Sequence, residues 1–342
     1  MSAITKTSKA LFFFLTFVLV LATIIGLQIS GAANPFKLVD PGAVVRWGLP
    51  ITRSLTDIAM ATSVGALAIA AFVFAEGSKQ LKTSMNVASI AAIVWTIAGM
   101  LQFNFVYLNV TGSSFTFAQS HGSGLWLFAT SVELGSYLAL NILGGALIAV
   151  LALAFQRLTA AASIAALGFL SLVPIALTGH AAGTANHGMA VNALGLHLLA
   201  IALVMVRARA EVTETHFSRY SSLALIAYLL LGVSGIISAA LRVGSLANWF
   251  TSYGLLIVLK TAIFAVLGIF GAIYRKRLML KGSAFLRLIG FEIVLMAVAM
   301  GLATALSRTA PPVNAVELVG NSPAEILTGS KLPPEFNAVT FF

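Results

Sequence analysis

Residues 135–155 read GSYLALNILGGALIAVLALAF, a run of 21 residues without a charged side chain. An α-helix of that length rises about 30 Å, which matches the hydrocarbon core of a bilayer. Eight other segments have the same character, so the pattern predicts an all-α fold, a polytopic transmembrane helical bundle of about nine helices. The predicted spans are residues 10–31, 54–75, 84–106, 135–155, 159–178, 190–206, 220–241, 254–274 and 285–306.

The composition of the whole chain supports a surface that faces lipid. Hydrophobic residues make up 59% of the 342 residues and charged residues only 9%, whereas a soluble protein has about 25% charged residues. The net charge is +10, but the cations stand at the ends of apolar runs and form no basic stripe. We therefore expect a lipid bilayer as partner and no nucleic acid. The absence of cysteine excludes disulfides, thiolate metal sites and iron–sulfur clusters, and leaves His, Met and carboxylate sites open.

The positive charges also predict the orientation of the chain. With the N-terminus inside and the nine spans alternating, thirteen of the 20 Lys and Arg residues fall inside, six fall outside and Lys260 lies within the membrane. This bias follows the positive-inside rule. It predicts a multi-pass protein of the cell (cytoplasmic) membrane with a cytoplasmic N-terminus and an extracytoplasmic C-terminal tail.

The expected organisation has three parts. Residues 1–32 form an N-terminal transmembrane helix, which we interpret as retained because its apolar run is longer than that of a signal peptide. Residues 33–312 form the main helical domain, and 313–342 form an extracytoplasmic tail or connector. Outside the membrane, turn-forming residues predict a structured loop over 32–53. Residues 125–134 predict a half-inserted or interfacial helix that leads into the span at 135–155.

Histidines gather near the predicted outer side of the membrane. A short turn makes the spans 159–178 and 190–206 antiparallel neighbours, so His180 and His197 can face each other, with His187 and Met189 above them. Imidazole and thioether ligands without thiolate suit copper, especially Cu(I). His121, in a Gly/Ser-rich loop, is a further candidate ligand. The alternative is that these histidines are interfacial polar residues and that His197 bonds to a carbonyl group.

Two charged residues fall inside predicted spans, where charge usually faces a cavity or a partner. Lys260 and Glu292 differ in depth by about 10 Å, so they are not expected to form a direct pair. Lys260 can extend to the outer interface instead of serving transport, and Glu292 is the better candidate for a functional carboxylate. Arg53 and Asp57 stand four residues apart and predict a local ion pair.

Three methionines fall in the outer halves of predicted helices, namely Met60, Met296 and Met300. Met296 and Met300 stand four residues apart and so share one helix face. A methionine pair of this kind can relay Cu(I), but methionine in an apolar helix more often fills space in the core. We favour the second interpretation.

Several short motifs, in their order and spacing, resemble those of the CopD family of bacterial copper-resistance membrane proteins. The resemblance covers residues 40–312, and its outer loop at 40–50 is similar to that of actinobacterial members. The motifs are Gly179-His180-Ala181, His187, Leu196-His197-Leu198-Leu199-Ala200, Phe217-Ser218-Arg219, Gly232-Val233-Ser234-Gly235, Tyr253-Gly254, Leu259-Lys260, Phe285-Leu286-Arg287 and Leu306-Ser307-Arg308-Thr309-Ala310-Pro311-Pro312.

The resemblance implies that the chain transports copper across the membrane or delivers it to oxidase assembly, and that it is not an enzyme. It also implies a CtaG-like oxidase assembly protein or a periplasmic-type copper chaperone as partner. Residues 322–334 resemble the connector that precedes a CtaG-like module. The chain departs from the family at 202–207, where a Trp-x-Gly-Gly-like stretch is usual, which puts a path along that helix in question.

Two further functions remain open from the sequence. Paired histidines on neighbouring helices are also what bis-His ligation of a b-type haem requires, as in an electron-transfer membrane protein. The chain can also be a scaffold of an oxidase-assembly complex that holds no metal ion.

Overall fold

The described part of the chain is helical. The computed structural model describes residues 2–35, 40–115, 121–176, single positions within 225–243, 246–276, 283–309 and 312. Its elements are α1 (Ser2–Ser30), α2 (Ala43–Phe72), α3 (Lys79–Thr111), α4 (His121–Ser131), α5 (Glu133–Ala154), α6 (Leu158–Ala176), the 3₁₀ helix η1 (Leu246–Phe250), α9 (Ser252–Lys276) and α10 (Ser283–Arg308). The described positions within 225–243 are helical as well.

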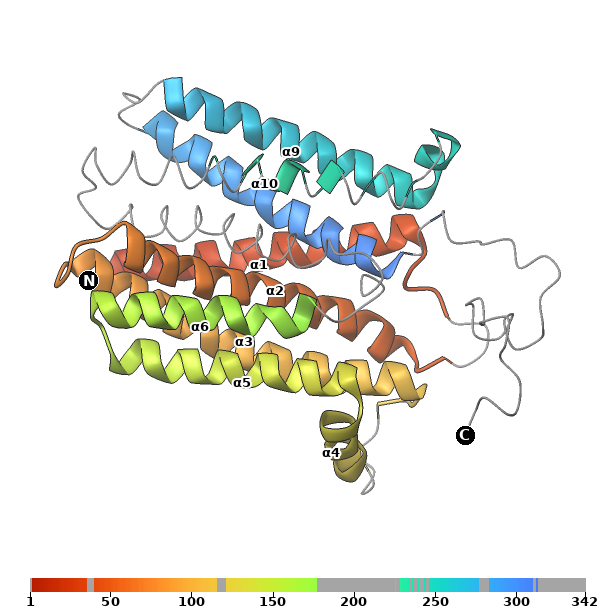
Figure 1. Cartoon of the computed structure of the whole chain (residues 1–342). Coiled ribbons are helices and arrows are strands. Elements are labelled where there is room, and N and C mark those ends of the chain that lie inside the picture. The colour runs from red at the N-terminus through yellow and green to blue at the C-terminus, as the bar shows by residue number, and fades with distance from the viewer. Residues whose placement is uncertain are drawn as a thin grey trace.

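The long helices confirm the predicted polytopic bundle. Seven of the described helices are long and apolar enough to cross a membrane, and each corresponds to one predicted span. The predicted span at 190–206 lies outside the described residues, and the one at 220–241 is described only at single positions. Figure 1 shows the seven helices lying side by side, with the short α4 transverse to them beside one end.

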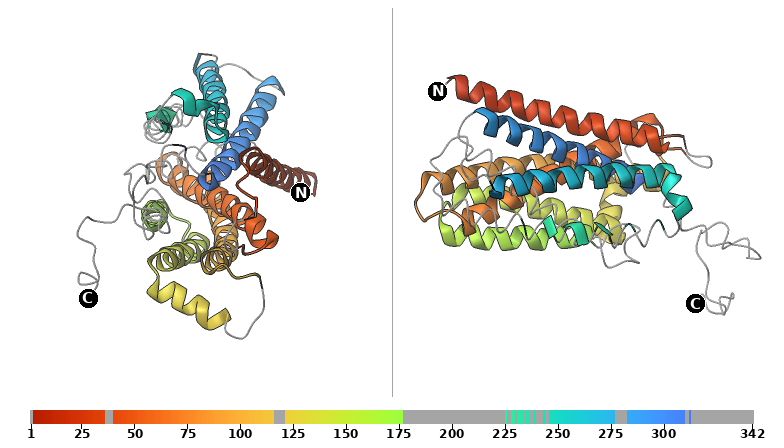
Figure 2. Two further views of the ribbon diagram at one scale, coloured as in Figure 1. Left: turned by 90° about the vertical axis from the view of Figure 1, so that its right-hand side faces the viewer. Right: turned by 90° about the horizontal axis from the view of Figure 1, so that it is seen from above.

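The helices form two groups with separate cores. In the first group, α2, α3, α5 and α6 enclose a core that contains Leu67, Trp95 and Ile148, each 0% exposed. In the second, α1 and α10 pack together with α9 beside them, around residues such as Leu19 and Leu256. The left view of Figure 2 shows the two groups end on. They meet along a seam where α10 and α1 lie against α2.

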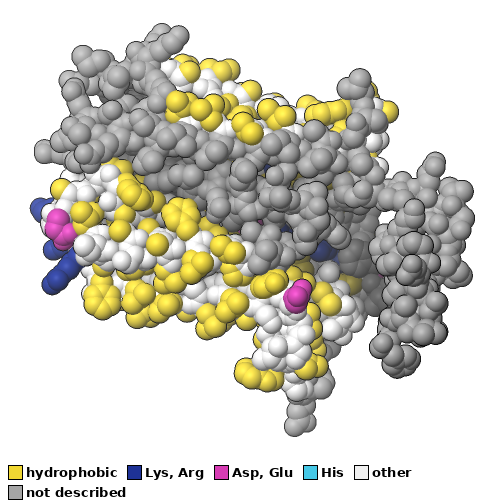
Figure 3. All heavy atoms as spheres, viewed as in Figure 1, with side chains coloured by type: hydrophobic (Ala, Val, Ile, Leu, Met, Phe, Trp, Pro, Cys, Tyr) yellow, Lys and Arg dark blue, Asp and Glu magenta, His cyan; other side chains and the backbone are white. Residues whose placement is uncertain are grey.

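The two ends of the bundle can be assigned to the two sides of the membrane from the direction of the helices. We call the end that holds the last residues of α1, α3 and α10 and the first residue of α2 the outer end, because the charge distribution predicts that it faces outside. The opposite end is the inner end. Figure 3 shows hydrophobic side chains over the described surface in view and basic side chains mainly at the inner end, on the left. This arrangement agrees with the positive-inside pattern.

Helix α2 begins earlier than the sequence indicates. The stretch 32–53 was predicted to be a loop, but its second half is helical from Ala43 onward and contains Pro50. A proline lacks the N–H that would bond to the carbonyl four residues before it. In this helix, Thr52 Oγ1 donates to the Gly48 carbonyl (2.8 Å) and Ser54 Oγ donates to the Pro50 carbonyl (2.8 Å). The carbonyl that Pro50 leaves without its helical partner is that of Arg46, so these two hydroxyls bond to other carbonyls of the same region.

Arg46 ties the remaining loop to the first turn of α2. Its guanidinium forms an ion pair with Asp40, and its Nε donates to the Ala33 carbonyl (3.1 Å). Arg46 therefore joins the first turn of α2 to the described residues on both sides of 36–39.

Small residues bring α1 and α10 into close contact. A Cβ atom added at Gly301 would lie 2.7 Å from the Leu19 carbonyl oxygen and 2.7 Å from the Ala22 Cβ. One added at Gly26 would lie 2.6 Å from the Ala305 Cβ. Both helices carry two small residues four positions apart, which is the small-xxx-small pattern of closely packed membrane helices. Since the pairs advance in the same direction, α1 and α10 are parallel.

The helix predicted over 125–134 is present as α4, and it leads directly into α5. It projects from the side of the bundle beside the outer end of α5, transverse to the long helices (Figure 1). Trp126 and Leu127 project from it and are 72% and 61% exposed. Exposed tryptophan at this level is typical of a helix in the membrane interface.

Candidate functional site

His121 is the one predicted metal ligand that lies within the described residues. It begins α4, and its Nε2 is 2.9 Å from the Asn104 Nδ2 of α3. The Tyr107 ring meets the imidazole edge-on, with centroids 5.4 Å apart. A Cβ atom at Gly124 would lie 2.0 Å from the Tyr107 hydroxyl, so any larger residue there would have to displace the Tyr107 ring. His121 is thus held at the outer end against α3.

The Asn104 amide can determine which nitrogen of the His121 imidazole carries the proton and which one has a lone pair for a metal ion. As placed, its Nδ2 faces the imidazole, and its Oδ1 is a buried oxygen with no hydrogen-bond partner among the described atoms. Reversing the amide would let Oδ1 accept from the Nε2–H, and the two amide orientations are distinguished only by such bonding. The lone pair of Nδ1 would then be available, as in a metal-ligating histidine that a neighbouring acceptor orients.

The remaining predicted ligands, His180, His187, His197 and Met189, lie outside the described residues. The helix that leads to them, α6, is described up to Ala176. The position of Ala176 along the bundle axis follows from the contact of α6 with α5. The Asn141 Nδ2 of α5 donates to the Ser171 carbonyl of α6 (2.8 Å). Since α5 and α6 are antiparallel, Ala176 lies near the first turn of α5, at the outer end. In the described part of the chain, no three His, Cys, Asp or Glu residues gather as a metal site.

A polar network occupies the core of the first helix group. Asn141 is 2% exposed, and its Oδ1 accepts from the Trp95 Nε1 (2.8 Å). Its Nδ2 donates to the Ser171 carbonyl and lies 3.4 Å from the Met60 Sδ. One amide therefore joins α2, α3, α5 and α6, and both its oxygen and its nitrogen are bonded to protein groups. The Met60 sulfur is engaged in this network and lies in a packed core.

Met296 and Met300 fill space between helices. Both are 5% exposed, and they pack with Leu15 and Leu19 of α1 and Ala61 of α2. Their neighbours are aliphatic, which agrees with the interpretation of these methionines as core residues. They lie in the seam between the two helix groups.

Charged residues stand at the outer part of the same seam. Arg53 Nε is 4.0 Å from Asp57 Oδ2, and both side chains are about one quarter exposed, at 27% and 26%. Arg308, at the end of α10, is half-buried, and its Nη2 donates to the Asn109 Oδ1 of α3 (3.4 Å). Arg53 and Asp57 thus stand at the distance of a weak ion pair along α2.

The two charged residues predicted within the membrane are both half-buried in the second helix group. Lys260 lies on α9 and Glu292 on α10. Lys260 is eight residues from the outer end of α9, and Glu292 is nine residues from the inner end of α10. Each is therefore placed about 12–14 Å along its helix from that end.

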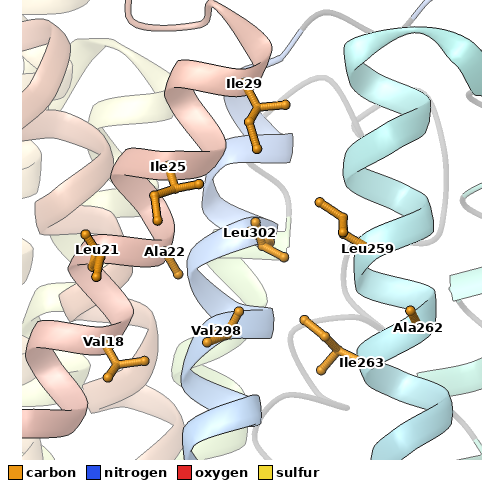
Figure 4. A pocket seen from close by; sticks show the side chains of 10 residues that line it. All are labelled: Val18, Leu21, Ala22, Ile25, Ile29, Leu259, Ala262, Ile263, Val298 and Leu302. Atoms are coloured by element: carbon orange, nitrogen blue, oxygen red, sulfur yellow. The ribbon is translucent and has the colours of Figure 1, made fainter.

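An apolar pocket opens between α1, α9 and α10. Its volume is about 360 Å³, and Figure 4 shows aliphatic side chains from the three helices lining it. Val18, Ile25, Leu259, Ile263 and Leu302 are among the ten residues of its wall. None of the ten has a polar side chain, so the pocket offers a metal ion no side-chain ligand.

Two protein families match the chain, one over each helix group. The N-terminal domain family of copper resistance protein D-like proteins matches residues 43–190, and the copper resistance protein D family matches residues 214–306. The chain belongs to the CopD family. It is therefore a multi-pass membrane protein of a copper resistance family. No curated protein and no solved structure matches it.

The family boundaries divide the bundle as the two cores do. The N-terminal CopD match begins at the first residue of α2 and includes α3 to α6, and the second includes α9 and most of α10. Helix α1 precedes both matched ranges, yet its closest packing is against α10 of the second. The part of the seam where α10 lies against α2 is thus the junction of the two CopD matches.

Sequence reasoning missed three polar residues that organise this structure. Asn141 and Asn104 interrupt apolar runs, and that interruption is a signal for a buried polar contact. Arg308 was assigned only to the outside of the membrane. Its position at the seam depends on the packing of α10 against α2, which its own segment does not reveal.

Proposed function

We propose that this CopD-family chain binds copper at the outer face of the membrane through His180, His187 and His197, with Met189 assisting and His121 joining from α4. The observation that carries the proposal is the pair of copper resistance family matches, over 43–190 and 214–306. The first of them includes His180, His187 and Met189. The haem alternative has no support from either family description.

The geometry of His121 supports this proposal. Its imidazole is fixed at the outer end by Asn104 and Tyr107, and α6 leads toward the histidine cluster from the same end. A neighbouring group that fixes the orientation of a histidine ring makes that ring a better metal ligand. A mixed set of imidazole and thioether ligands without cysteine suits Cu(I) better than zinc.

In this proposal the chain carries an ion and catalyses no reaction. Copper held at the outer face would either cross the cytoplasmic membrane or pass to an oxidase-assembly partner of the CtaG-like kind. A periplasmic-type copper chaperone would supply or receive it on that side. Glu292 and Lys260 would set the charge along the interior of the second helix group.

Copper content of the purified protein tests the proposal. We expect the wild-type chain, loaded with Cu(I) and freed of excess metal, to retain at least one copper ion. His180→Ala and His197→Ala should each lose most of it, because removing one ligand from a site of this kind lowers metal affinity at least as much as the 10–100-fold loss seen for second-shell changes. His121→Ala should lower affinity by a smaller factor.

The matched control is His216→Ala, which removes an imidazole from the predicted cytoplasmic side. It should leave the copper content unchanged. Equal copper content in wild type, His180→Ala and His197→Ala would rule out the proposed site. A Soret band in the optical spectrum of the same sample would instead indicate haem.

A further inference from the structure

The charged pair of α2, next to the seam, lies on the side of that helix that reaches α6. At about 100° per residue, positions 53, 57, 60 and 64 fall within about 60° of one another around the helix axis. The Met60 sulfur belongs to the polar network that joins α2 to α6. A Cβ atom at Gly168 of α6 would lie 3.1 Å from the Val64 Cγ2. The stripe of α2 that carries Arg53 and Asp57 therefore faces α6.

The same contacts give the level of the pair along α6. Val64 meets Gly168, and one turn nearer the outer end the Met60 sulfur and the Ser171 carbonyl bond to the same amide nitrogen. The two pairs advance in opposite directions, so α2 and α6 are antiparallel. Asp57 is a further turn toward the outer end and is therefore level with the last described turn of α6. Figure 1 shows these two helices beside each other.

This level is close to the first of the proposed copper ligands. His180 follows Ala176 by four residues, and a chain of four residues spans at most about 14 Å. Over residues 47–72 of α2 and the whole of α6, Arg53 and Asp57 are the only charged residues. Both side chains are only partly exposed, and at 4.0 Å their ion pair is weak. Each charge therefore still acts on its surroundings.

We infer that Asp57 compensates the charge of copper bound at the proposed site and that Arg53 beside it limits the affinity of that site. The inference rests on the proposed function, because it needs copper at His180. Imidazole and thioether ligands are neutral, so they leave the positive charge of Cu(I) uncompensated. A carboxylate within roughly 10–15 Å attracts the ion, and a guanidinium at a similar distance repels it.

Removing the two charges should change the copper affinity in opposite directions. Asp57→Asn should weaken Cu(I) binding about tenfold, which is the size expected for unit charges roughly 12 Å apart at an effective dielectric constant of about 20. Arg53→Gln should strengthen the binding by a similar factor. The double variant should bind much as the wild type does, because the two effects offset each other. A purely structural role of the pair would instead lower the affinity in each single variant.

Competition between the purified full-length protein and a colorimetric Cu(I) chelator measures these affinities. The titration is made in neutral detergent at low salt, because salt screens charges at this distance. Asp57→Glu keeps the negative charge and should retain most of the affinity. The matched controls are Glu76→Gln and Arg157→Gln, which make the same two charge changes at exposed positions of the inner end. Both should leave the affinity within about twofold of wild type, because they lie roughly 30 Å away.

The outcomes separate this inference from the proposed function. Opposite shifts in Asp57→Asn and Arg53→Gln support the inference, and any other pattern overturns it. If the wild type binds Cu(I) and His180→Ala loses it while the two charge variants bind equally, the copper site stands and the inference is wrong. If the wild type binds no Cu(I), the proposed function fails and the inference fails with it. Arg53→Gln keeps the test decisive if Asp57→Asn does not fold, because unfolding cannot raise the affinity.

Discussion

Replacing Gly301 by leucine is expected to lower the free energy of unfolding by about 3 kcal/mol, the upper part of the usual range for overpacking. The reason is that a side chain at this position meets backbone as well as side chain. Its Cβ would lie 2.7 Å from the Leu19 carbonyl oxygen and 2.8 Å from the Thr23 nitrogen. Backbone of a neighbouring helix cannot turn aside as a flexible side chain can, so α1 and α10 would have to separate.

Unfolding in mixed micelles titrated with sodium dodecyl sulfate measures this effect. Gly301→Ala should show a smaller loss, and Gly290→Leu is the matched control on the same helix, because no described atom lies within 4 Å of a Cβ at that position. The control should change stability by less than about 0.5 kcal/mol. If Gly301→Leu and Gly290→Leu were equally stable, the close parallel packing of α1 and α10 would be wrong.

The apolar spans could be predicted from the sequence because the bilayer imposes a length and a composition on each of them. The start of α2 could not. Turn-forming residues predicted a loop over 32–53, but the helix begins at Ala43, and Arg46 in its first turn has partners outside it. Those partners are contacts that no local pattern contains.

The pairing of helices was also beyond the sequence reasoning. The small residues at 22, 26, 301 and 305 stand in the printed sequence, but alanine and glycine are frequent in every span. Only the packing of the first described helix against the last selects these four.

For the candidate site, too, the sequence predicted some features and not others. The side chain types predicted a copper site, and the family matches agree with copper. His121 could be named from the sequence, but its orientation by Asn104 could not, because an asparagine 17 residues earlier has no evident relation to it. Asn141 was not predicted as a functional or structural residue, and its own span does not reveal that three other helices meet at its amide.

Asn141 gives the second large effect, because its amide is the meeting point of the four helices in the first group. Replacing it by leucine would leave the Trp95 indole N–H without an acceptor inside a core where Trp95 is 0% exposed. A buried donor left unpaired costs about 1–3 kcal/mol. The bond from Asn141 Nδ2 to the Ser171 carbonyl is lost as well, and a hydrogen bond between membrane helices contributes about 0.6 kcal/mol. We therefore expect Asn141→Leu to destabilise the bundle by about 2–3 kcal/mol.

A double-mutant cycle with Trp95→Phe separates the unpaired donor from the loss of shape. Phenylalanine removes the indole N–H, so Asn141→Leu should cost about 1 kcal/mol less in the Trp95→Phe background than in wild type. Gln156→Leu is the matched control, because it also removes an amide that bonds to a neighbouring helix, but at an exposed inner position. Its effect should be below about 0.5 kcal/mol and independent of residue 95. Strictly additive effects of Asn141→Leu and Trp95→Phe would show that the amide and the indole are not coupled, and the hydrogen bond between them would then not contribute to holding the four helices together.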